Sequence, residues 1–370
     1  MDLLNATKMQ AGYTMGMQPD GRESLVVAVK GTFTIPGGAE EPQLAEEQVP
    51  LIEADTFTGE PGFSAPVYES DYPLRKPRCD VLLHGSAYAP GGKPAARVTV
   101  SLQIGPVSKS FDVVGHRFWK KGLISVSASR PRPFTVMPIS YDNAFGGFDK
   151  SHKNPSKHRA YLVNPVGVGF HVNLKMESIE GKPLPNTEEK GNPVTKPNGN
   201  YRPMSFGPVG RGWLPRYKLA GTYDQNWLDN IFPFLPPDFD EAYYQSAPAD
   251  QQMPYPRGGE EVVLTNLTPE GTTRFNLPKI EVPVEFSMKN YDRKTTSAVI
   301  DTIVIEPDKR RFMMTWRSSL QLKKNMFEVL QVVVGKMPRA WYRARMTCKT
   351  YYPSLRELVR AKASVAEEGE

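Results

Sequence analysis

The sequence predicts a mainly β protein, with antiparallel sheets in a sandwich or barrel-like arrangement, long Gly/Pro-rich loops and a few short helices, one of them at the C-terminus. Three observations predict this class. Short alternating or β-branched runs recur along the 370 residues, 35 prolines and 30 glycines separate them, and 39% hydrophobic content is enough for a core. Such frequent breaks favour antiparallel sheets, because a parallel α/β design needs long crossover connections.

Hairpin signals give the clearest local predictions. Residues 97–114 form two β-type runs around the turn signal Gly-Pro-Val-Ser at 105–108. Residues 298–316 do the same around Glu-Pro-Asp-Lys at 306–309. The other expected strands are 24–35, 80–88 and 261–267, while 326–334 fits either a strand or a helix.

Two short helices are expected from their N-terminal capping signals. Thr222 and Gln225 have the spacing of a capping box, and Pro233 is expected to end the helix that follows. Ser354 and Glu357 repeat that spacing ahead of an apolar face, which predicts the C-terminal helix.

Composition suggests a division of the chain into two β-rich regions. The stretch 177–203 is rich in Pro, Lys and Asn and lacks apolar periodicity, so it is interpreted as a linker or a long loop. It separates an N-terminal β-rich region, 1–176, from a C-terminal one, 204–370, that ends in a basic segment and the terminal helix. Residues 367–370 are expected to fray.

Neither a disulfide, a metal site nor a membrane segment is expected. Cys79 and Cys348 lie far apart without zinc-type neighbours, and His84 and His116 lack a metal-binding spacing. The N-terminus lacks a basic start followed by an apolar core, and no window approaches the length of a membrane span. The sequence therefore predicts a cytosolic protein without a cofactor.

Positive charge is concentrated near the C-terminus. Residues 309–362 contain fourteen Lys or Arg against two acids, Glu328 and Glu357, so this segment carries +12 while the chain as a whole carries +6. An acidic protein surface or nucleic acid would fit such a segment, and a solvated basic face is the simpler alternative. No known nucleic-acid-binding module accompanies it.

Signatures of catalysis are weak. The stretch 62–66 fails the Gly-x-Ser-x-Gly pattern at its second glycine, and the glycines of 207–212 lack dinucleotide-loop spacing. Asp238 and Asp240 lie among aromatic residues and superficially resemble the carboxylate pair of a glycosidase. A single loop of neighbours seldom supplies two carboxylates across a bond, so we expect these side chains to order the loop through hydrogen bonds.

Exposed aromatic and arginine side chains are the expected means of holding a protein partner. We expect the Trp227 side chain to be buried in the core, and the Trp213 side chain to be less so, because Trp213 lies in a Gly-rich loop. An alternative is addition of a partner strand to a sheet edge. The candidate partner-binding residues are Arg211, Trp213, Arg216, Tyr217, Trp227, Phe232 and Phe234.

Ten short motifs, taken in order, resemble the domain-of-unknown-function 2169 (DUF2169) family. The longest are Asp80-Val-Leu-Leu-His-Gly-Ser-Ala-Tyr-Ala-Pro-Gly-Gly-Lys-Pro94, Asn143-Ala-Phe-Gly-Gly147 and Asn164-Pro-Val-Gly-Val-Gly-Phe170. The others lie at 181–188, 206–208, 220–224, 238–240, 247–252, 301–302 and 316–317. The motif-loop residues expected to be structural are Asn143, Phe145, Gly146, Gly147, Asn164, Pro165, Gly167, Gly169, Asp238 and Asp240.

The resemblance implies a function that composition alone does not. Members of the family are regarded as adaptors or chaperones of bacterial type VI secretion, which load an effector onto a PAAR-domain tip or the VgrG spike. The resemblance therefore implies a non-enzymatic cytoplasmic adaptor with no catalytic residues, no small-molecule substrate and no membrane contact. The alternatives are a hydrolase of a carbohydrate-like substrate acting through the Asp238–Asp240 loop, and a nucleic-acid-binding accessory protein.

Overall fold

The computed structural model describes residues 1–38, 40–122, 125–347, 349–352 and 354–360. Strands make up most of its regular structure and most strand pairs are antiparallel, which confirms the predicted mainly β class. Cys348 and residues 367–370, which the sequence singled out, lie outside the described residues. No helix in the described part of the chain is long and apolar enough to cross a membrane.

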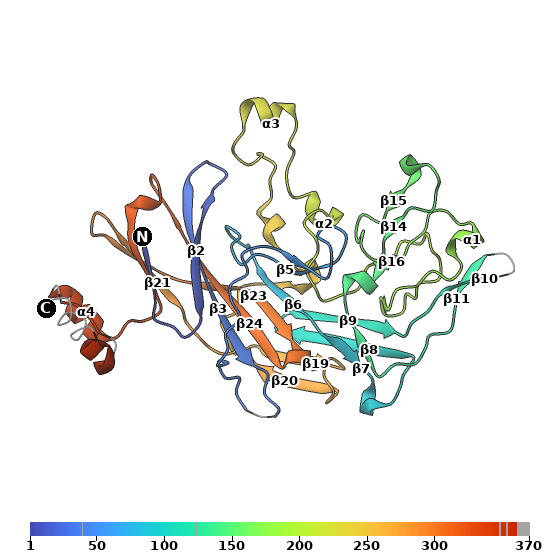
Figure 1. The fold of residues 1–370 in the computed structure, drawn as a ribbon, viewed down its shortest axis with the longest axis horizontal. Helices are drawn as coiled ribbons and strands as arrows, with labels where there is room; N and C mark the ends of the chain where they lie inside the picture. The colour runs from blue at the N-terminus through green and yellow to red at the C-terminus, as the bar shows by residue number, and fades with distance from the viewer. Residues whose placement is uncertain (39, 123–124, 348, 353, 361–370) are drawn as a thin grey trace.

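The largest sheet has six strands and forms the centre of the molecule (Figure 1). All neighbours in it are antiparallel except β6 and β23, which run parallel. In spatial order the strands are β18 (Gln252–Met253), β6 (Cys79–Leu83), β23 (Val299–Glu306), β24 (Arg311–Gln321), β3 (Glu23–Thr34) and β2 (Gln10–Met17).

Two further sheets pack around this one. A five-stranded antiparallel sheet contains β17 (Thr187–Glu188), β9 (Val107–Val114), β8 (Arg97–Ile104), β19 (Glu261–Thr265) and β20 (Thr272–Asn276). A four-stranded sheet contains β1 (Asp2–Asn5), β25 (Val329–Val334), β21 (Pro283–Met288) and β22 (Arg293–Ser297), with β1 parallel to β25.

One hydrophobic core joins the three sheets. Along β8 every second side chain from Val98 is buried, as expected for a strand with one face on a core. Phe111 of β9 packs against Phe206 with ring centroids 4.6 Å apart. Phe33 of β3 stacks on Phe312 of β24 at 5.4 Å. Because these side chains belong to a single buried cluster, the sheets form a layered, sandwich-like body.

Both predicted hairpins are confirmed, with one change in the first turn. Ile104 pairs with Val107, so the loop is only Gly105 and Pro106, and Gly105 adopts φ +51° as a tight turn requires. The predicted strand 80–88 is instead divided between β6 and β7 (Ser86–Tyr88), because β7 pairs with β12 (Val136–Pro138). The segment 326–334, which fitted a strand or a helix, is a 3₁₀ helix at Met326–Glu328 followed by the strand β25.

The helix predictions hold with a corrected cap. Helix α3 spans Gln225–Asn230, but its N-cap is Asp224, whose carboxylate accepts the Trp227 N–H at 2.8 Å. Near the C-terminus the Glu357 N–H donates to Ser354 Oγ at 3.3 Å, as the predicted capping box requires, and helical residues 355–360 follow. Helix α4 (Arg339–Met346) was not predicted.

Strands from both sides of residues 177–203 share the large sheets. This segment supplies β17, which pairs with β9, and Ile179 within it is fully buried. The central sheet likewise places β6 from the N-terminal side next to β18 and β23 from the C-terminal side. The division of the chain at this segment stays a prediction, although the pairing ties the two sides together.

Two of the family-motif loops, 143–147 and 164–170, lie side by side in a small lobe at one end of the molecule (Figure 1). Asn164 donates its side-chain N–H groups to the carbonyls of Tyr141 at 2.9 Å and Phe145 at 3.2 Å. A Cβ at Gly167 would lie 2.4 Å from the Ala144 carbonyl oxygen, so only glycine fits that approach. The lobe contains β10 (Trp119–Lys121), β11 (Val126–Ala128), β13 (Phe145–Gly146), β14 (Phe148–Asp149), β15 (Arg159–Ala160), β16 (Val168–Gly169) and α1 (Met176–Ile179).

Half-buried His84 makes stability depend on pH. Burial lowers its pKa from 6.5 to about 4, although Glu306 opposes that shift. Between these values the unfolded chain binds the proton and the folded chain does not, so stability falls as the pH falls. Between about pH 7 and pH 5, we expect the free energy of unfolding of the wild type to fall by about 2 kcal/mol more than that of a His84→Gln variant. Urea unfolding at several pH values measures this; equal pH slopes for the two proteins would contradict it.

Candidate partner-binding site

The seven candidate partner-binding residues lie on one projecting segment. Residues 211–244, here called the arm, contain α2 (Leu214–Tyr217), α3 and the 3₁₀ helix η4 (Glu241–Tyr244). Figure 1 shows the arm, in yellow, extending from the body with α3 at its tip. The two ends of the arm meet at its foot, where the Asp240 N–H donates to the Leu219 carbonyl at 3.0 Å.

Buried Arg216 fixes the foot of the arm. Its side chain is 4% exposed and pairs with the carboxylate of Glu69. Its guanidinium also donates to the Val209 carbonyl at 2.7 Å and to the Tyr243 carbonyl at 2.8 Å. The planar guanidinium thus donates to three different groups. Arg216 therefore connects both ends of the arm to the body.

Arg211 adds an ion pair beside this connection. Its Nε lies 2.6 Å from Asp55 Oδ2, and its Nη2 lies 3.2 Å from Glu69. Burial alone would raise the pKa of Asp55, but the hydrogen bond from Arg211 and the N–H of Ser70 hold that pKa below its usual value. The carboxylate therefore stays charged and paired at neutral pH.

Trp213 is the third anchor of the foot. It is 6% exposed and meets the ring of Tyr141 edge-on, with centroids 5.2 Å apart. Trp227, by contrast, is only half-buried. The relative burial of the two tryptophans is thus the reverse of what we expected. Trp213 and Arg216 are placed to support the arm, and direct contact of either with a partner stays a prediction.

The carboxylates of the arm order its backbone. Asp238 accepts the Thr222 N–H at 2.9 Å and the Thr222 hydroxyl at 2.7 Å. Asp240 caps η4 by accepting the Ala242 N–H at 2.8 Å. The hydrogen bonds from Thr222 lower the pKa of exposed Asp238, whereas a general acid needs a raised pKa. This geometry matches the expected loop-ordering role.

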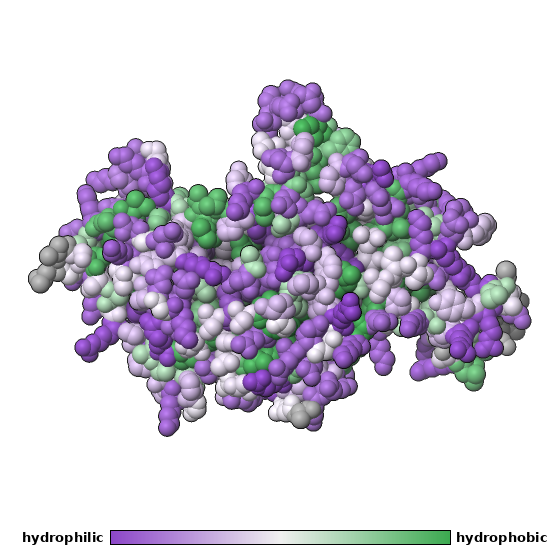
Figure 2. All heavy atoms as spheres, turned by 180° about the vertical axis from the view of Figure 1, so that it is seen from behind, coloured by the Kyte–Doolittle hydropathy of each residue, from purple (hydrophilic) through white to green (hydrophobic). Residues whose placement is uncertain are grey.

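Aromatic side chains cover the outer part of the arm. The ring of Trp227 lies 4.8 Å from that of Tyr223 and 5.6 Å from that of Phe232, and its indole N–H donates to the Phe234 carbonyl at 2.9 Å. Tyr217 is 65% exposed and Phe232 is 62% exposed. Hydrophobic side chains are visible along the side of the arm in Figure 2, below a polar tip.

Phe234 also connects the arm to the central sheet. A Cβ at Gly21, in the turn between β2 and β3, would lie 2.6 Å from the Phe234 ring. Gly21 has φ +80°, so this close contact and the turn itself both call for glycine. The arm is thus braced at its foot and along its side.

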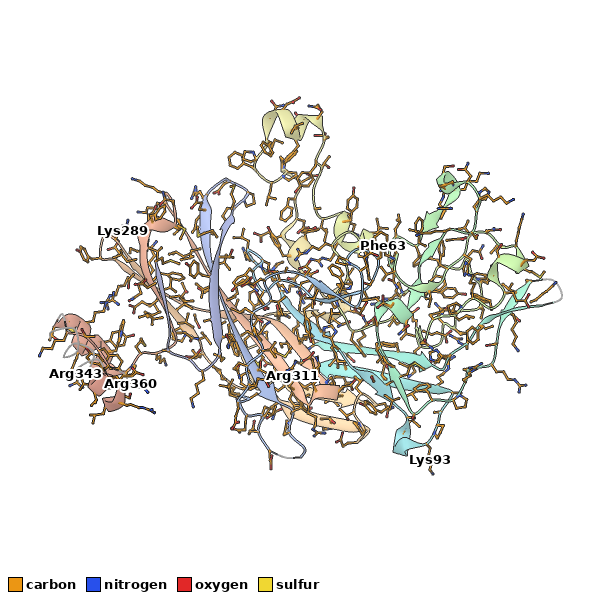
Figure 3. All side chains as sticks on the ribbon, viewed as in Figure 1. Phe63, Lys93, Lys289, Arg311, Arg343 and Arg360 are labelled. Carbon is orange, nitrogen blue, oxygen red and sulfur yellow. The ribbon has the colours of Figure 1, made fainter. Side chains whose placement is uncertain are left out.

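A cavity of about 250 Å³ opens at the foot of the arm. Its lining includes Asp55, Phe57, Glu69, Pro165, Arg211 and Trp213. Phe63 lies in the turn beside it and is 70% exposed (Figure 3). We did not single out Phe57 or Phe63 from the sequence. The Pro61-Gly62 dipeptide is a turn signal that marks a loop at this position, directly before Phe63.

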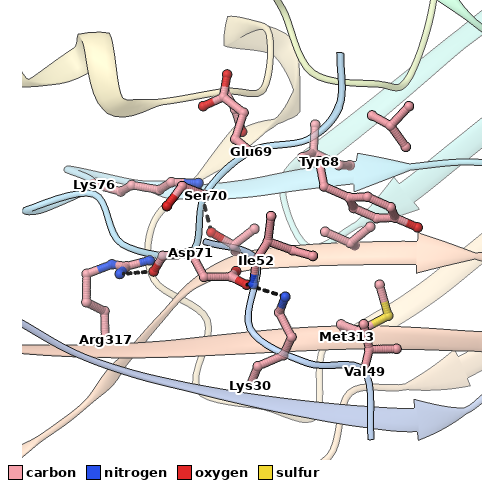
Figure 4. A pocket seen from close by; sticks show the side chains of 15 residues that line it. Lys30, Val49, Ile52, Tyr68, Glu69, Ser70, Asp71, Lys76, Met313 and Arg317 are labelled. Atoms are coloured by element: carbon pink, nitrogen blue, oxygen red, sulfur yellow. Dashed lines mark hydrogen bonds and ion pairs between the residues drawn. The ribbon is translucent and has the colours of Figure 1, made fainter. Parts of the chain in front are cut away.

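A buried ionic network lies in the central sheet, away from solvent (Figure 4). Lys30 and Arg317 both face Asp71: Lys30 pairs with its carboxylate, and Arg317 Nη1 donates to its backbone carbonyl at 2.6 Å. Arg317 also pairs with buried Asp301. These charges are paired with one another and enclose a cavity of only about 30 Å³, which indicates a structural role.

No group of three or more His, Cys, Asp or Glu side chains in the described ranges could hold a metal ion. Burial raises the pKa of the Cys79 thiol, so this cysteine is not an activated nucleophile.

Comparison with known families gives one match. A family model described as "Uncharacterized protein conserved in bacteria (DUF2169)" matches residues 20–317, which include the arm and the residues that anchor its foot. No curated protein and no solved structure shows significant similarity to the chain.

Proposed function

The chain belongs to the DUF2169 family, and we propose that it is a non-enzymatic adaptor that binds a type VI secretion effector in the bacterial cytoplasm and aids its loading onto a PAAR-domain tip or VgrG spike. The observation that carries the proposal is the arm, a projecting segment that exposes aromatic side chains and is braced at its foot. Exposed clusters of this kind are typical of protein-binding surfaces.

The bracing of the arm supports binding without catalysis. Arg216 and Trp213 hold the foot in one geometry before any partner arrives, which lowers the entropy cost of association. The carboxylates that a hydrolase would need are engaged with backbone N–H groups. We therefore favour an adaptor over the hydrolase and expect neither a cofactor nor a small-molecule substrate.

A sheet edge offers a second mode of contact. Strand β2 is an edge of the central sheet, and its sequence, Gln-Ala-Gly-Tyr-Thr-Met-Gly-Met, contains no charged residue. Edge strands usually carry charges or proline that prevent pairing with other chains. An effector strand could add to β2 while the arm holds another part of the same client.

Effector secretion in living cells tests the proposal. Deletion of the gene should reduce the secretion of one effector, while the activity of that effector in vitro is unchanged. Complementation with an Asp238→Asn/Asp240→Asn variant should restore secretion to at least about half of the wild-type level, because each Asn retains an acceptor oxygen for the loop. Normal secretion without the protein would refute the adaptor; complete loss with the Asn variant would favour the hydrolase.

A further inference from the structure

A second cleft, of about 510 Å³, lies between two loops at the end of the molecule opposite the motif lobe. One wall is the β21–β22 turn and the other is the connection from β24 to β25. The Lys289 N–H donates to the Glu328 carbonyl at 2.8 Å and joins the two walls. We call this the lysine cleft, after Lys289, Lys294, Lys323 and Lys324, which line it together with Phe327.

The four lysines of the cleft are available to a ligand. All are exposed, and no ion pair joins any of them to a carboxylate within the described ranges. The acids of the lining are engaged locally: Glu328 accepts the N–H groups of Lys323 and Lys324, and Asp292 accepts from the Asn290 amide at 2.6 Å. The acids thus shape the loops, and the four lysines outnumber the two carboxylates and leave the lining with a net positive charge.

Apolar groups accompany the charges. Phe327 is 68% exposed in the cleft lining. Tyr291, at the tip of the β21–β22 turn, is 91% exposed and has φ +67°, a left-handed conformation that is unfavourable for a bulky residue. Strained backbone conformations of this kind cluster at functional sites.

We propose that the lysine cleft binds an acidic segment of a protein partner that also carries an apolar side chain. The lysines complement carboxylates, and Phe327 complements the apolar group. A nucleic acid fits less well, because a lining of four lysines and two carboxylates carries a small net positive charge at one spot and not the continuous positive groove that follows a phosphate backbone. The site is separate from the arm, so the proposal does not depend on the adaptor function.

Fluorescence anisotropy of a labelled peptide with alternating glutamate and phenylalanine tests the proposal on the full chain. A Lys289→Glu/Lys324→Glu variant should bind about tenfold more weakly or worse than the wild type. The matched control is Lys93→Glu/Lys190→Glu, which makes the same charge change at two exposed lysines outside the cleft; Figure 3 shows Lys93 on the opposite side of the molecule from Lys289. The control should bind within about twofold of the wild type.

The apolar part of the site is tested in the same way. Phe327→Ala should weaken binding about fivefold, whereas Phe63→Ala, at a phenylalanine of similar exposure, should not. Urea unfolding of each variant shows whether it is folded. The proposal is overturned if the wild type does not bind the peptide, if both lysine variants weaken it equally, or if single-stranded DNA binds more tightly and displaces it.

Discussion

Replacement of Tyr217 and Phe232 by alanine is expected to weaken effector binding about 100-fold, equivalent to about 3 kcal/mol, because exposed aromatic anchors dominate the energy of protein interfaces. Both side chains are more than 60% exposed, so their truncation removes little packing in the free protein. The free energy of unfolding should therefore change by less than about 0.5 kcal/mol. Titration of purified effector against both proteins, with urea unfolding in parallel, measures the two effects.

The matched control removes two aromatic rings elsewhere on the surface. Phe118, beside β10, is 37% exposed and Phe148 of β14 is 47% exposed, and both lie outside the arm and β2. A Phe118→Ala/Phe148→Ala variant should bind the effector within about threefold of the wild type. If the control loses as much affinity as the arm variant, or if the arm variant keeps wild-type affinity, the arm is not the binding surface. A selective loss in the control would instead point to the motif lobe.

Replacement of Arg317 by methionine is expected to cost about 3–5 kcal/mol of stability, the largest effect of any single substitution considered. Arg317 and Asp301 are both almost completely buried, and Arg317 also holds the Asp71 carbonyl. Methionine would leave the Asp301 charge in the interior without its partner. Urea unfolding at neutral pH measures the loss as a shift of the midpoint.

Two further variants distinguish the effect of the unpaired Asp301 charge from the loss of an arginine side chain in general. Arg274 pairs with Glu261 at the surface, with side chains 60% and 56% exposed, and Arg274→Met should cost less than about 1 kcal/mol. In Arg317→Met/Asp301→Leu the second change removes the orphaned charge and should recover much of the loss. A double variant less stable than Arg317→Met would show that the buried charge is not the cause.

Local sequence signals predicted much of the fold. The hairpin 97–114 was identified from its turn residues and alternation, because register in a hairpin is set by neighbours in the chain. The pairing of β6 with β23 was not predictable in this way, since their partners are more than two hundred residues apart. Likewise β17 has only two residues, and its strand character comes from pairing with β9.

The candidate residues of the arm were selected from the sequence, but their burial could not be inferred from it, and their contact with a partner stays a prediction. Trp213 is buried because Tyr141 lies against it, and Arg216 is buried because Glu69 lies opposite. Neither partner is near the arm in sequence, so exposure could not be inferred from the Gly-rich surroundings. The lysine cleft was missed for the same reason, since Lys289 is thirty-five residues before Lys324, outside the basic segment that the charge count defined.

Co-purification from the native bacterium tests the adaptor function most directly. The tagged wild-type protein and the Tyr217→Ala/Phe232→Ala variant would be isolated at moderate salt, and the proteins bound to each identified by mass spectrometry. We predict that a toxin linked to a PAAR-domain or VgrG protein is recovered with the wild type and lost from the arm variant. Recovery of the wild type with no protein partner would contradict the adaptor function and direct attention to substrate screening.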